Sequence, residues 1–411
     1  MSTAAPPEAR LAEPGHDTLA GAFRTYLDKV KAGDVGSLPV IVGMAIIVIV
    51  FTAKVNVFFT SVNFNNLIVQ LAPIALISIG VVFVLLLGEI DLSIGFVSGV
   101  CGVCVAWFAE PGTGHTVPGL LAIFLAIGLG ALIGAFQGSF VALLGVPSFV
   151  VTLAGLLAWQ GVIIKWIGNQ ATIGIQDKYV NDMANYYFTH TASWILAAVV
   201  SVAFALSTAA GIISRRRADL PTGNLLLPAL RVLGIAAAAF LVVGISNRSN
   251  AGFPFAGLLL VAMLVLWTFV AKRTTFGRHV YAVGGSAEAA RRAGISVPFI
   301  RIVVFMISGA MAALGGVVFA ARLNGVDLTA GGGSTLLDAI AAAVIGGTSL
   351  FGGRGRVVAA LLGALVIRTI ANGLGLLGSS SATEFIITGV ILLAAVTLDT
   401  LSRRRLERSG R

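Results

Sequence analysis

Long apolar segments follow one another along most of the chain and alternate with short polar ones. A helix needs roughly 20 residues to cross a hydrocarbon core of about 30 Å, and most of these segments reach that length. The apolar runs cover residues 38–59, 65–87, 92–109, 118–144, 148–167, 193–213, 225–245, 254–271, 300–322, 335–353, 355–377 and 382–399. This pattern predicts an all-α, polytopic membrane helix bundle with about 10 to 12 spans.

Two of the runs, 92–109 and 335–353, are short and interrupted by glycine. The second run rises about 28 Å as a helix, which is just enough to cross. If it were re-entrant, the arginine-rich C-terminus would lie on the opposite side of the membrane from the N-terminus. We therefore expect 335–353 to cross, either as one helix or as a broken one.

The composition excludes an ordinary soluble domain. Of the 411 residues, 57% are hydrophobic and only 11% are charged, whereas soluble proteins carry roughly 25% charged residues. The net charge of +10 would suggest nucleic acid in a soluble chain, but here the basic residues lie in short clusters between apolar runs. The sequence therefore predicts a lipid bilayer as the environment and no nucleic-acid partner.

The basic residues also predict an orientation. If both termini are cytoplasmic, 21 of the 27 Lys and Arg residues lie inside, as the positive-inside rule requires. The inside segments are residues 1–37, 214–231, 272–301, 354–356 and 401–411. The expected organisation is a cytoplasmic tail (1–37), a transmembrane permease domain (38–400) and a basic cytoplasmic tail (401–411).

The N-terminal tail has no apolar core beside a cleavage site, so no cleaved signal peptide is expected. Part of it has apolar residues at helical spacing, which suits a helix on the membrane surface, although a disordered tail fits equally well. These residues are Leu19, Phe23, Tyr26, Leu27 and Val30.

Several kinds of chemistry are absent from the sequence. None of the six lysines follows a glycine, so the chain has no Walker A loop and is not its own ATPase. The four histidines are scattered, which argues against a metal centre, an enzyme or a bound cofactor. Cys101 and Cys104 lie in an apolar run and are expected to be packing residues.

Three acidic residues interrupt the apolar pattern: Glu89, Asp91 and Asp338. Such charges are costly in a membrane and indicate function by default. They and the neighbouring Ser93 are candidates for a transport pathway through broken helices, or for a proton relay. Helix capping is the alternative, because Asp91 precedes an expected helix start at residue 92 and Asp338 follows Thr335 in a capping-box pattern.

Two further features of the apolar runs leave alternatives open. Arg368 lies about 18 Å into its run with Asn372 on the same face, and it either has a structural partner or lines the pathway. Small residues at four-residue spacing indicate close helix packing within one bundle or, alternatively, a dimer seam. They are Gly95 and Gly99, then Gly130, Gly134 and Gly138, then Ser308, Ala312, Gly316 and Ala320.

A basic polar segment, residues 284–298, has the signals of a complete short helix. Ser286 suits the N-cap, Glu288 the first turn, and Gly294 a left-handed stop, while Pro298 prevents continuation. A two-turn helix is marginal alone, so we expect a partner protein to hold it. Its candidate docking residues are Ser286, Glu288, Ala289, Arg291, Arg292 and Gly294.

Four segments together resemble the permease subunits of ABC sugar importers of the ribose, arabinose and xylose type. They appear in the family's order, and residues 146–161 with the extra arginine-rich loop near 214–250 look most like the xylose-type branch. The four segments are GEIDLSIG at 88–95, TFGRHVYAVGGSAEAARRAGI at 275–295, LDAIAAAVIGGTSLFGGRG at 337–355 and NGL at 372–374.

The resemblance implies a type II importer fold in the bacterial inner membrane and import of a monosaccharide, of which a pentose such as xylose is favoured. It also implies a homodimer, a separate cytoplasmic ATPase docked on the helix near Ser286, and an extracytoplasmic sugar-binding protein. This sequence departs from the family's pattern at Ser286, where Asn is common, and at Arg368, where a small residue is usual. The alternative function is a proton-coupled secondary sugar transporter that uses the buried acidic residues.

Overall fold

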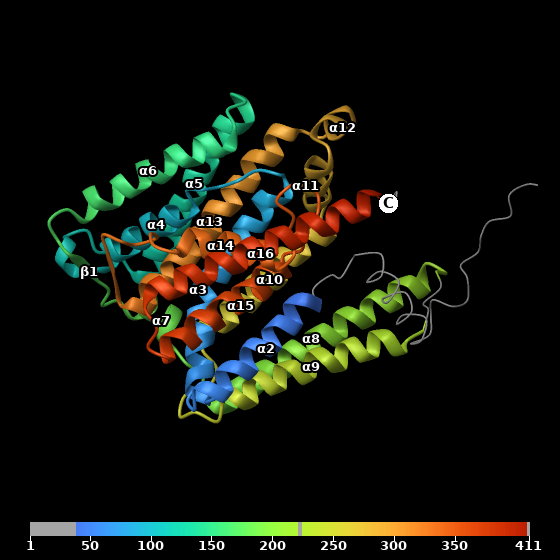
Figure 1. Cartoon of the computed structure of the whole chain (residues 1–411), viewed down its shortest axis with the longest axis horizontal. Coiled ribbons are helices and arrows are strands. Elements are labelled where there is room, and N and C mark those ends of the chain that lie inside the picture. Colours follow the sequence, from blue (N-terminus) through green and yellow to red (C-terminus); the bar gives the residue numbers. More distant parts are fainter. Residues whose placement is uncertain (1–37, 221–223, 409–411) are drawn as a thin grey trace, which may run out of the picture. The chain divides into compact units, whose positions relative to one another are not determined.

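The computed structural model describes residues 38–220 and 224–408, and almost all of its regular structure is helical (Figure 1). The predicted surface helix of the N-terminal tail falls outside these residues. The helices are α2 (Leu38–Lys54), α3 (Ser61–Leu86), α4 (Ile94–Ala109), α5 (Gly119–Leu143), α6 (Ser148–Ile167), α7 (Lys178–Asn185), α8 (His190–Arg217), α9 (Leu226–Ser246), α10 (Phe255–Arg273), α11 (Thr275–Gly285), α12 (Ala287–Arg292), α13 (Val297–Leu323), α14 (Thr335–Ile345), α15 (Val358–Leu376) and α16 (Ser381–Arg408).

Within the described residues, eight helices are long and apolar enough to cross a membrane: α3, α5, α6, α8, α9, α10, α13 and α15. Four more have shorter apolar stretches, in α2, α4, α14 and α16. The all-α, multi-span class expected from the sequence is therefore confirmed. The last helix continues to Arg408, into the segment expected to be a separate tail.

The chain divides into two compact units. One contains residues 191–244, which form most of α8 and α9. The other contains residues 37–190 and 245–400 and holds the remaining helices, with α16 as far as residue 400. Every candidate site residue predicted from the sequence lies in the second unit, which we call the main unit.

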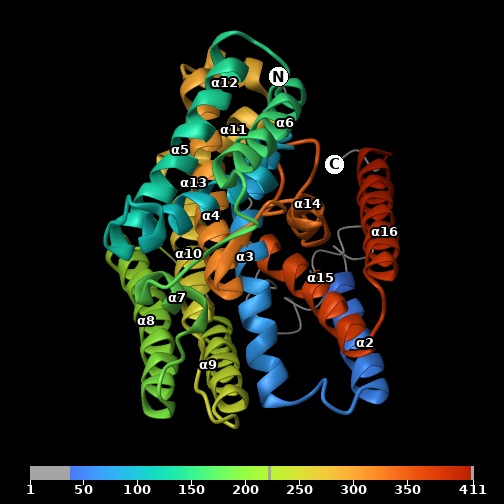
Figure 2. The same cartoon turned by 90° about the vertical axis from the view of Figure 1, so that its left-hand side faces the viewer.

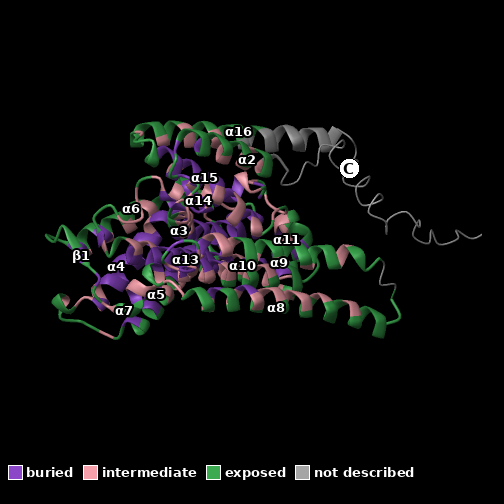
Figure 3. Cartoon of the chain, turned by 90° about the horizontal axis from the view of Figure 1, so that it is seen from below, coloured by how far each residue is buried: buried purple, intermediate pink, exposed green. Residues whose placement is uncertain are grey.

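The core of the main unit is built around α3 and α13. From Val69 to Leu86 nearly every residue of α3 is buried, and α13 is buried along most of its length (Figure 3). α5 packs closely on α13, because a Cβ added at Gly134 would lie 2.0 Å from the Phe305 carbonyl oxygen. The glycine stripe of α5 therefore serves packing inside one chain, one of the two roles the sequence left open.

A smaller apolar cluster joins α2 to α15. Phe51 and Phe58 pack with Ile370 and Leu374, and the two phenyl rings lie 5.4 Å apart between centroids. On another part of the main unit, the short strands β1 (Thr172–Gly174) and β2 (Gly325–Asp327) pair antiparallel, with Ile173 opposite Val326. This pairing places the end of α6 and the end of α13 at the same face.

The run 335–353 does not form one continuous helix, the first of the two forms expected from the sequence. α14 ends at Ile345 after 11 residues, a rise of about 16 Å or roughly half of a hydrocarbon core. A loop at 328–334 precedes it, and the glycine-rich loop 346–357 follows it beside α11 (Figure 2). The run is therefore broken, the second of the two forms expected.

Candidate functional site: a helix pair on the ends of the buried spans

α12 has the capping expected from the sequence. The Ser286 hydroxyl accepts a hydrogen bond from the Ala289 amide at 3.2 Å. At the other end Gly294 has φ +82°, and the Ile295 amide donates to the Ala290 carbonyl at 3.0 Å. These contacts satisfy backbone groups at both termini, as in a helix closed by a left-handed residue. Pro298 lies in the first turn of the next helix, α13.

The polar side chains of α12 face outward. Glu288 and Arg292 form an ion pair of 2.9 Å between Oε1 and Nη2, with both side chains largely exposed. Arg291 and Ala289 are also exposed, whereas Ala290 is buried against the rest of the unit. One face of α12 is therefore anchored and the other is free to meet another molecule.

α11 leads into α12 and contacts the ends of two buried segments. A Cβ added at Gly284 would lie 1.8 Å from the Leu86 carbonyl oxygen and 2.9 Å from the Gly353 amide nitrogen. The Gly353 amide itself donates to the Leu86 oxygen at 2.9 Å. Here three backbones meet, from α11, from the end of α3 and from the loop 346–357. We call this contact the glycine junction (Gly284, Leu86, Gly353).

A second contact fastens the same loop to α11. The Tyr281 hydroxyl donates to the Gly355 carbonyl at 2.9 Å. Burial raises the pKa of Tyr281, and the nearby Arg356 offsets part of that effect. The phenol therefore stays protonated at physiological pH and remains a donor. The helix pair α11 and α12 thus rests on the ends of the buried segments through two independent contacts.

Glu89 lies in the loop between α3 and α4 and is paired with a cation that the sequence reading missed. Its Oε1 is 3.1 Å from an Arg301 Nη2 atom in the second turn of α13, with both side chains mostly buried. The sequence pattern places Arg301 among the basic residues that predict a cytoplasmic segment, and nothing in its local sequence pairs it with a residue 212 positions earlier. The pair ties the 87–93 loop to α13.

Asp91 sits in a buried polar cluster. One carboxylate oxygen accepts from the Ser93 amide at 3.0 Å, and the other accepts from the Ser308 hydroxyl at 3.2 Å. The Ser93 hydroxyl also lies 3.1 Å from Gln137 Oε1. The prediction that Asp91 caps a helix starting at residue 92 is wrong in detail, because α4 starts at Ile94 and Asp91 binds the residue before it.

Asp338 does not form the predicted capping box with Thr335. Its carboxylate accepts from the Ser334 hydroxyl at 2.8 Å and forms an ion pair with Arg368 of α15. The Asp338 side chain is 2% exposed and that of Arg368 is 14% exposed. Asp338 pairs with a residue of another helix and does not cap its own. A buried guanidinium without a counter-charge costs more free energy than a helix end that lacks one capping acceptor. Arg368 therefore has a structural partner.

Asn372 lies one turn after Arg368 and pairs with Asn63 of α3. The two side-chain amides exchange hydrogen bonds of 2.9 and 3.0 Å. Asn63 also donates to the Phe58 carbonyl at 2.8 Å. Each asparagine thus satisfies hydrogen-bonding groups of the other, which would otherwise be buried without partners in an apolar core. The sequence pattern does not single out Asn63, because it lies in the short polar segment between the apolar runs 38–59 and 65–87.

The predicted site residues thus separate into several contacts in the structure. The α12 residues lie together on an exposed face, next to the glycine junction. Glu89 and Asp91 share one loop, but Glu89 binds Arg301 and Asp91 binds serine hydroxyls. Asp338 has a different partner again, Arg368. Across residues 38–220 and 224–408, no three His, Cys, Asp or Glu residues gather as metal ligands.

A bundle of membrane-length helices, a broken segment at α14, and a helix pair set on the ends of the buried segments are the features of a membrane permease. The chain belongs to the family described as branched-chain amino acid transport system / permease component, whose model matches residues 63–396. No solved structure shows significant similarity to it.

Curated relatives cover nearly the whole chain. The xylose transport system permease protein XylH of Escherichia coli K12 is 34% identical over 98% of this chain and 100% of its own. XylH of Haemophilus influenzae is 33% identical over 92% of this chain and 100% of its own. The ribose import permease protein RbsC of Escherichia coli K12 is 32% identical over 87% of this chain and 91% of its own.

Proposed function

We propose that this chain is the permease subunit of an ABC importer and moves a monosaccharide, with xylose favoured, into the cytoplasm. The observation that carries the proposal is α12, a fully capped and exposed short helix that rests through the glycine junction on the ends of the buried spans. A helix of six residues does not persist alone. Its neighbours hold it in place, and its charged face points outward. Relatives named as xylose and ribose permeases support the substrate class.

The proposal implies partners and a location. The chain carries no Walker A loop, so a separate cytoplasmic ATPase supplies the energy and docks on α12. An extracytoplasmic binding protein delivers the sugar, and two copies of the permease form the pathway. The assembly lies in the inner membrane of a bacterium with both termini in the cytoplasm. The permease provides the path and performs no catalysis.

A proton-coupled transporter is the alternative, and the contacts of the buried carboxylates weigh against it. A relay needs groups that can pass a proton from one to the next. Glu89 and Asp338 are instead held by arginines, and Asp91 accepts hydrogen bonds from Ser93 and Ser308. Each carboxylate is therefore held by a different partner, and these separate contacts do not form the continuous chain of groups that a relay needs.

Transport in reconstituted vesicles separates the two functions. The permease, its ATPase and its binding protein are reconstituted together, and uptake of labelled xylose and ribose is measured with and without ATP. We expect uptake that needs ATP and persists when a protonophore abolishes the proton gradient. Uptake that continues without ATP and stops with the protonophore would establish the secondary transporter instead.

The docking role of α12 has its own test. The double reversal Arg291→Glu with Arg292→Glu inverts the charge of the exposed face, and exposed charges are worth about 0–1 kcal/mol each. We expect reduced co-purification of the ATPase and a several-fold loss of sugar-stimulated ATP hydrolysis. The matched control is Lys272→Glu with Arg273→Glu, the same charge change at the end of α10. Parental co-purification and hydrolysis in the α12 variant would refute the docking role.

A further inference from the structure

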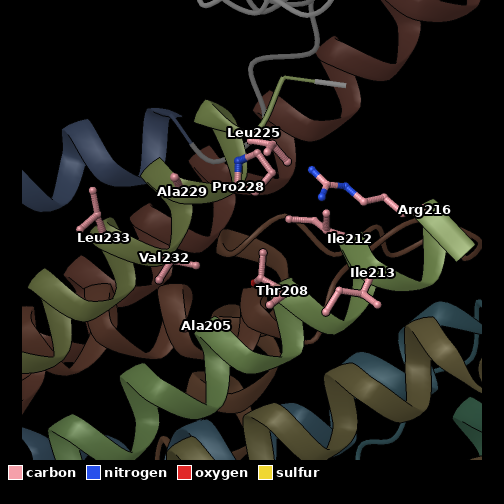
Figure 4. A pocket seen from close by; sticks show the side chains of 11 residues that line it. Ala205, Thr208, Ile212, Ile213, Arg216, Leu225, Pro228, Ala229, Val232 and Leu233 are labelled. Atoms are coloured by element: carbon pink, nitrogen blue, oxygen red, sulfur yellow. The ribbon is translucent and has the colours of Figure 1, made fainter. Parts of the chain in front are cut away.

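A groove of about 560 Å³ runs between α8 and α9 (Figure 4). Its walls are apolar or small side chains, among them Ala205, Ala229 and Val232. Thr208 is the one neutral polar residue in the lining, and its hydroxyl already donates to the Phe204 carbonyl at 2.9 Å. Apart from Arg216 at one end, the lining has few hydrogen-bonding groups for a sugar and suits a hydrocarbon chain.

One end of the groove is positively charged. Arg216 belongs to the lining, and its guanidinium points across the groove toward Leu225, which precedes α9, and Pro228 of α9 (Figure 4). Arg215 and Arg217 flank it in the last turn of α8. Asp219 is the one acidic residue between positions 191 and 246, and no residue that the structure describes forms an ion pair with Arg216. This charge therefore remains available to an external anion.

The dimensions match one leaflet of a bilayer. From Ala205 to Arg216 the axis of α8 rises about 16 Å, which is close to half of a hydrocarbon core of about 30 Å. The groove therefore has the length of an acyl chain from mid-membrane to the headgroup level, with the arginines at the headgroup end. Arginine is suited to that position because its fork of donors binds phosphate oxygens.

We propose that this groove binds an anionic phospholipid, with one acyl chain between α8 and α9 and the phosphate at Arg216. The basic end selects a negative headgroup, since basic pockets between membrane helices attract anionic lipids. The apolar length selects a lipid over a free phosphate. The proposal concerns these two helices alone and holds whichever substrate the permease carries.

Native mass spectrometry of the purified full-length chain tests the site. The probes are palmitoyl-oleoyl phosphatidylglycerol and phosphatidylcholine, which share their acyl chains and differ in charge. We expect the wild type to retain the anionic lipid in preference to the zwitterionic one. Arg216→Gln should lower retention of phosphatidylglycerol about fivefold, the effect of one basic residue at a membrane surface. The control Arg231→Gln removes an exposed arginine of α9 that lies outside the lining, and should leave retention unchanged.

A second pair of variants tests the apolar part. Ala229→Trp fills the groove and should reduce phosphatidylglycerol retention, whereas Ala237→Trp adds the same bulk to an exposed position of α9 outside the lining. Equal lipid retention in all four variants would overturn the proposal. So would competition by millimolar inorganic phosphate, which would indicate a simple anion site, or a change of oligomeric state by Ala229→Trp with lipid retention intact, which would assign the groove to a second copy.

Discussion

Two ion pairs inside the main unit each join elements that are distant in sequence. Asp338 and Arg368 join α14 to α15, and Glu89 and Arg301 join the loop after α3 to α13. A buried pair adds little net stability by itself, but removing one partner leaves an uncompensated charge. Loss of a single charge is therefore the sensitive probe of these contacts.

Asp338→Asn should destabilise the protein by about 3–5 kcal/mol, the cost of leaving Arg368 buried without a counter-charge. A capping role would cost only about 0.5–2 kcal/mol. Thermal unfolding in detergent measures the difference. The control Asp327→Asn affects an exposed carboxylate that accepts only from Thr329, and should cost far less. Adding Arg368→Met to Asp338→Asn should recover stability, and a double variant as unstable as the single one would contradict the pairing.

Gly284→Ala should impair transport because the glycine junction has no room for a side chain. Its Cβ would overlap the Leu86 carbonyl oxygen, a backbone atom that cannot move aside alone. The neighbour Gly285 has open space around its Cβ position, so Gly285→Ala is the matched control. We expect ATP-driven uptake to fall several-fold in Gly284→Ala and to stay near the parental rate in Gly285→Ala. Equal rates in the two variants would show that transport does not depend on the close contact at the glycine junction.

At the scale of elements, two short helices, α12 and α14, depend on their neighbours for stability. α12 has six residues and α14 has eleven, so neither is stable by length alone. A glycine lies just beyond the end of each, Gly294 after α12 and Gly346 after α14. The loop after α14 returns to α11, where it contacts Tyr281 and Gly284. Because the helix stops at the end of α14, the backbone amides and carbonyls of the loop 346–357 are free of helical hydrogen bonds. They can therefore contact α11 and the end of α3.

Gly294→Val should impair docking of the ATPase on α12 more than the charge reversal Arg291→Glu with Arg292→Glu does. Gly294 has φ +82° and open space beside it, so the obstacle is the backbone angle and not a clash. Gly294→Asn is the control, because asparagine tolerates the left-handed region. We expect ATPase co-purification and sugar-stimulated hydrolysis to fall in the valine variant and to survive in the asparagine variant. Full activity of the valine variant would show that the direction of the chain after α12 is unimportant.

At the scale of the whole molecule, the distribution of basic residues predicts the orientation of the spans. Reporter fusions after Arg217 and after Arg405 should both read cytoplasmic, because 21 of the 27 basic residues then lie inside. A fusion at residue 250, between α9 and α10, is the control and should read outside. A cytoplasmic signal at residue 250, or an outside signal at either arginine, would break this topology.

Much of the architecture could be predicted from periodicity and local signals. Most of the apolar runs correspond to observed helices because a membrane requires about 20 apolar residues for each crossing. The caps of α12 could be predicted because Ser286 and Gly294 bind or shape backbone only a few residues away. The glycine stripe of α5 indicated close packing for the same reason, since a missing side chain permits approach whatever the partner.

The partners of the buried charges depended on tertiary structure. The sequence assigned Asp338 to its neighbour Thr335, a local cap, but folding brought Arg368 of another helix to it. Likewise Asn372 found Asn63, and Gly284 met Leu86 and Gly353. Capping and spanning are properties of contiguous residues, so the sequence alone determined them. Pairing inside a bundle depends on which helix faces lie together, and the long-range Coulomb attraction of a buried ion pair then outweighs the local hydrogen bond that a capping box provides.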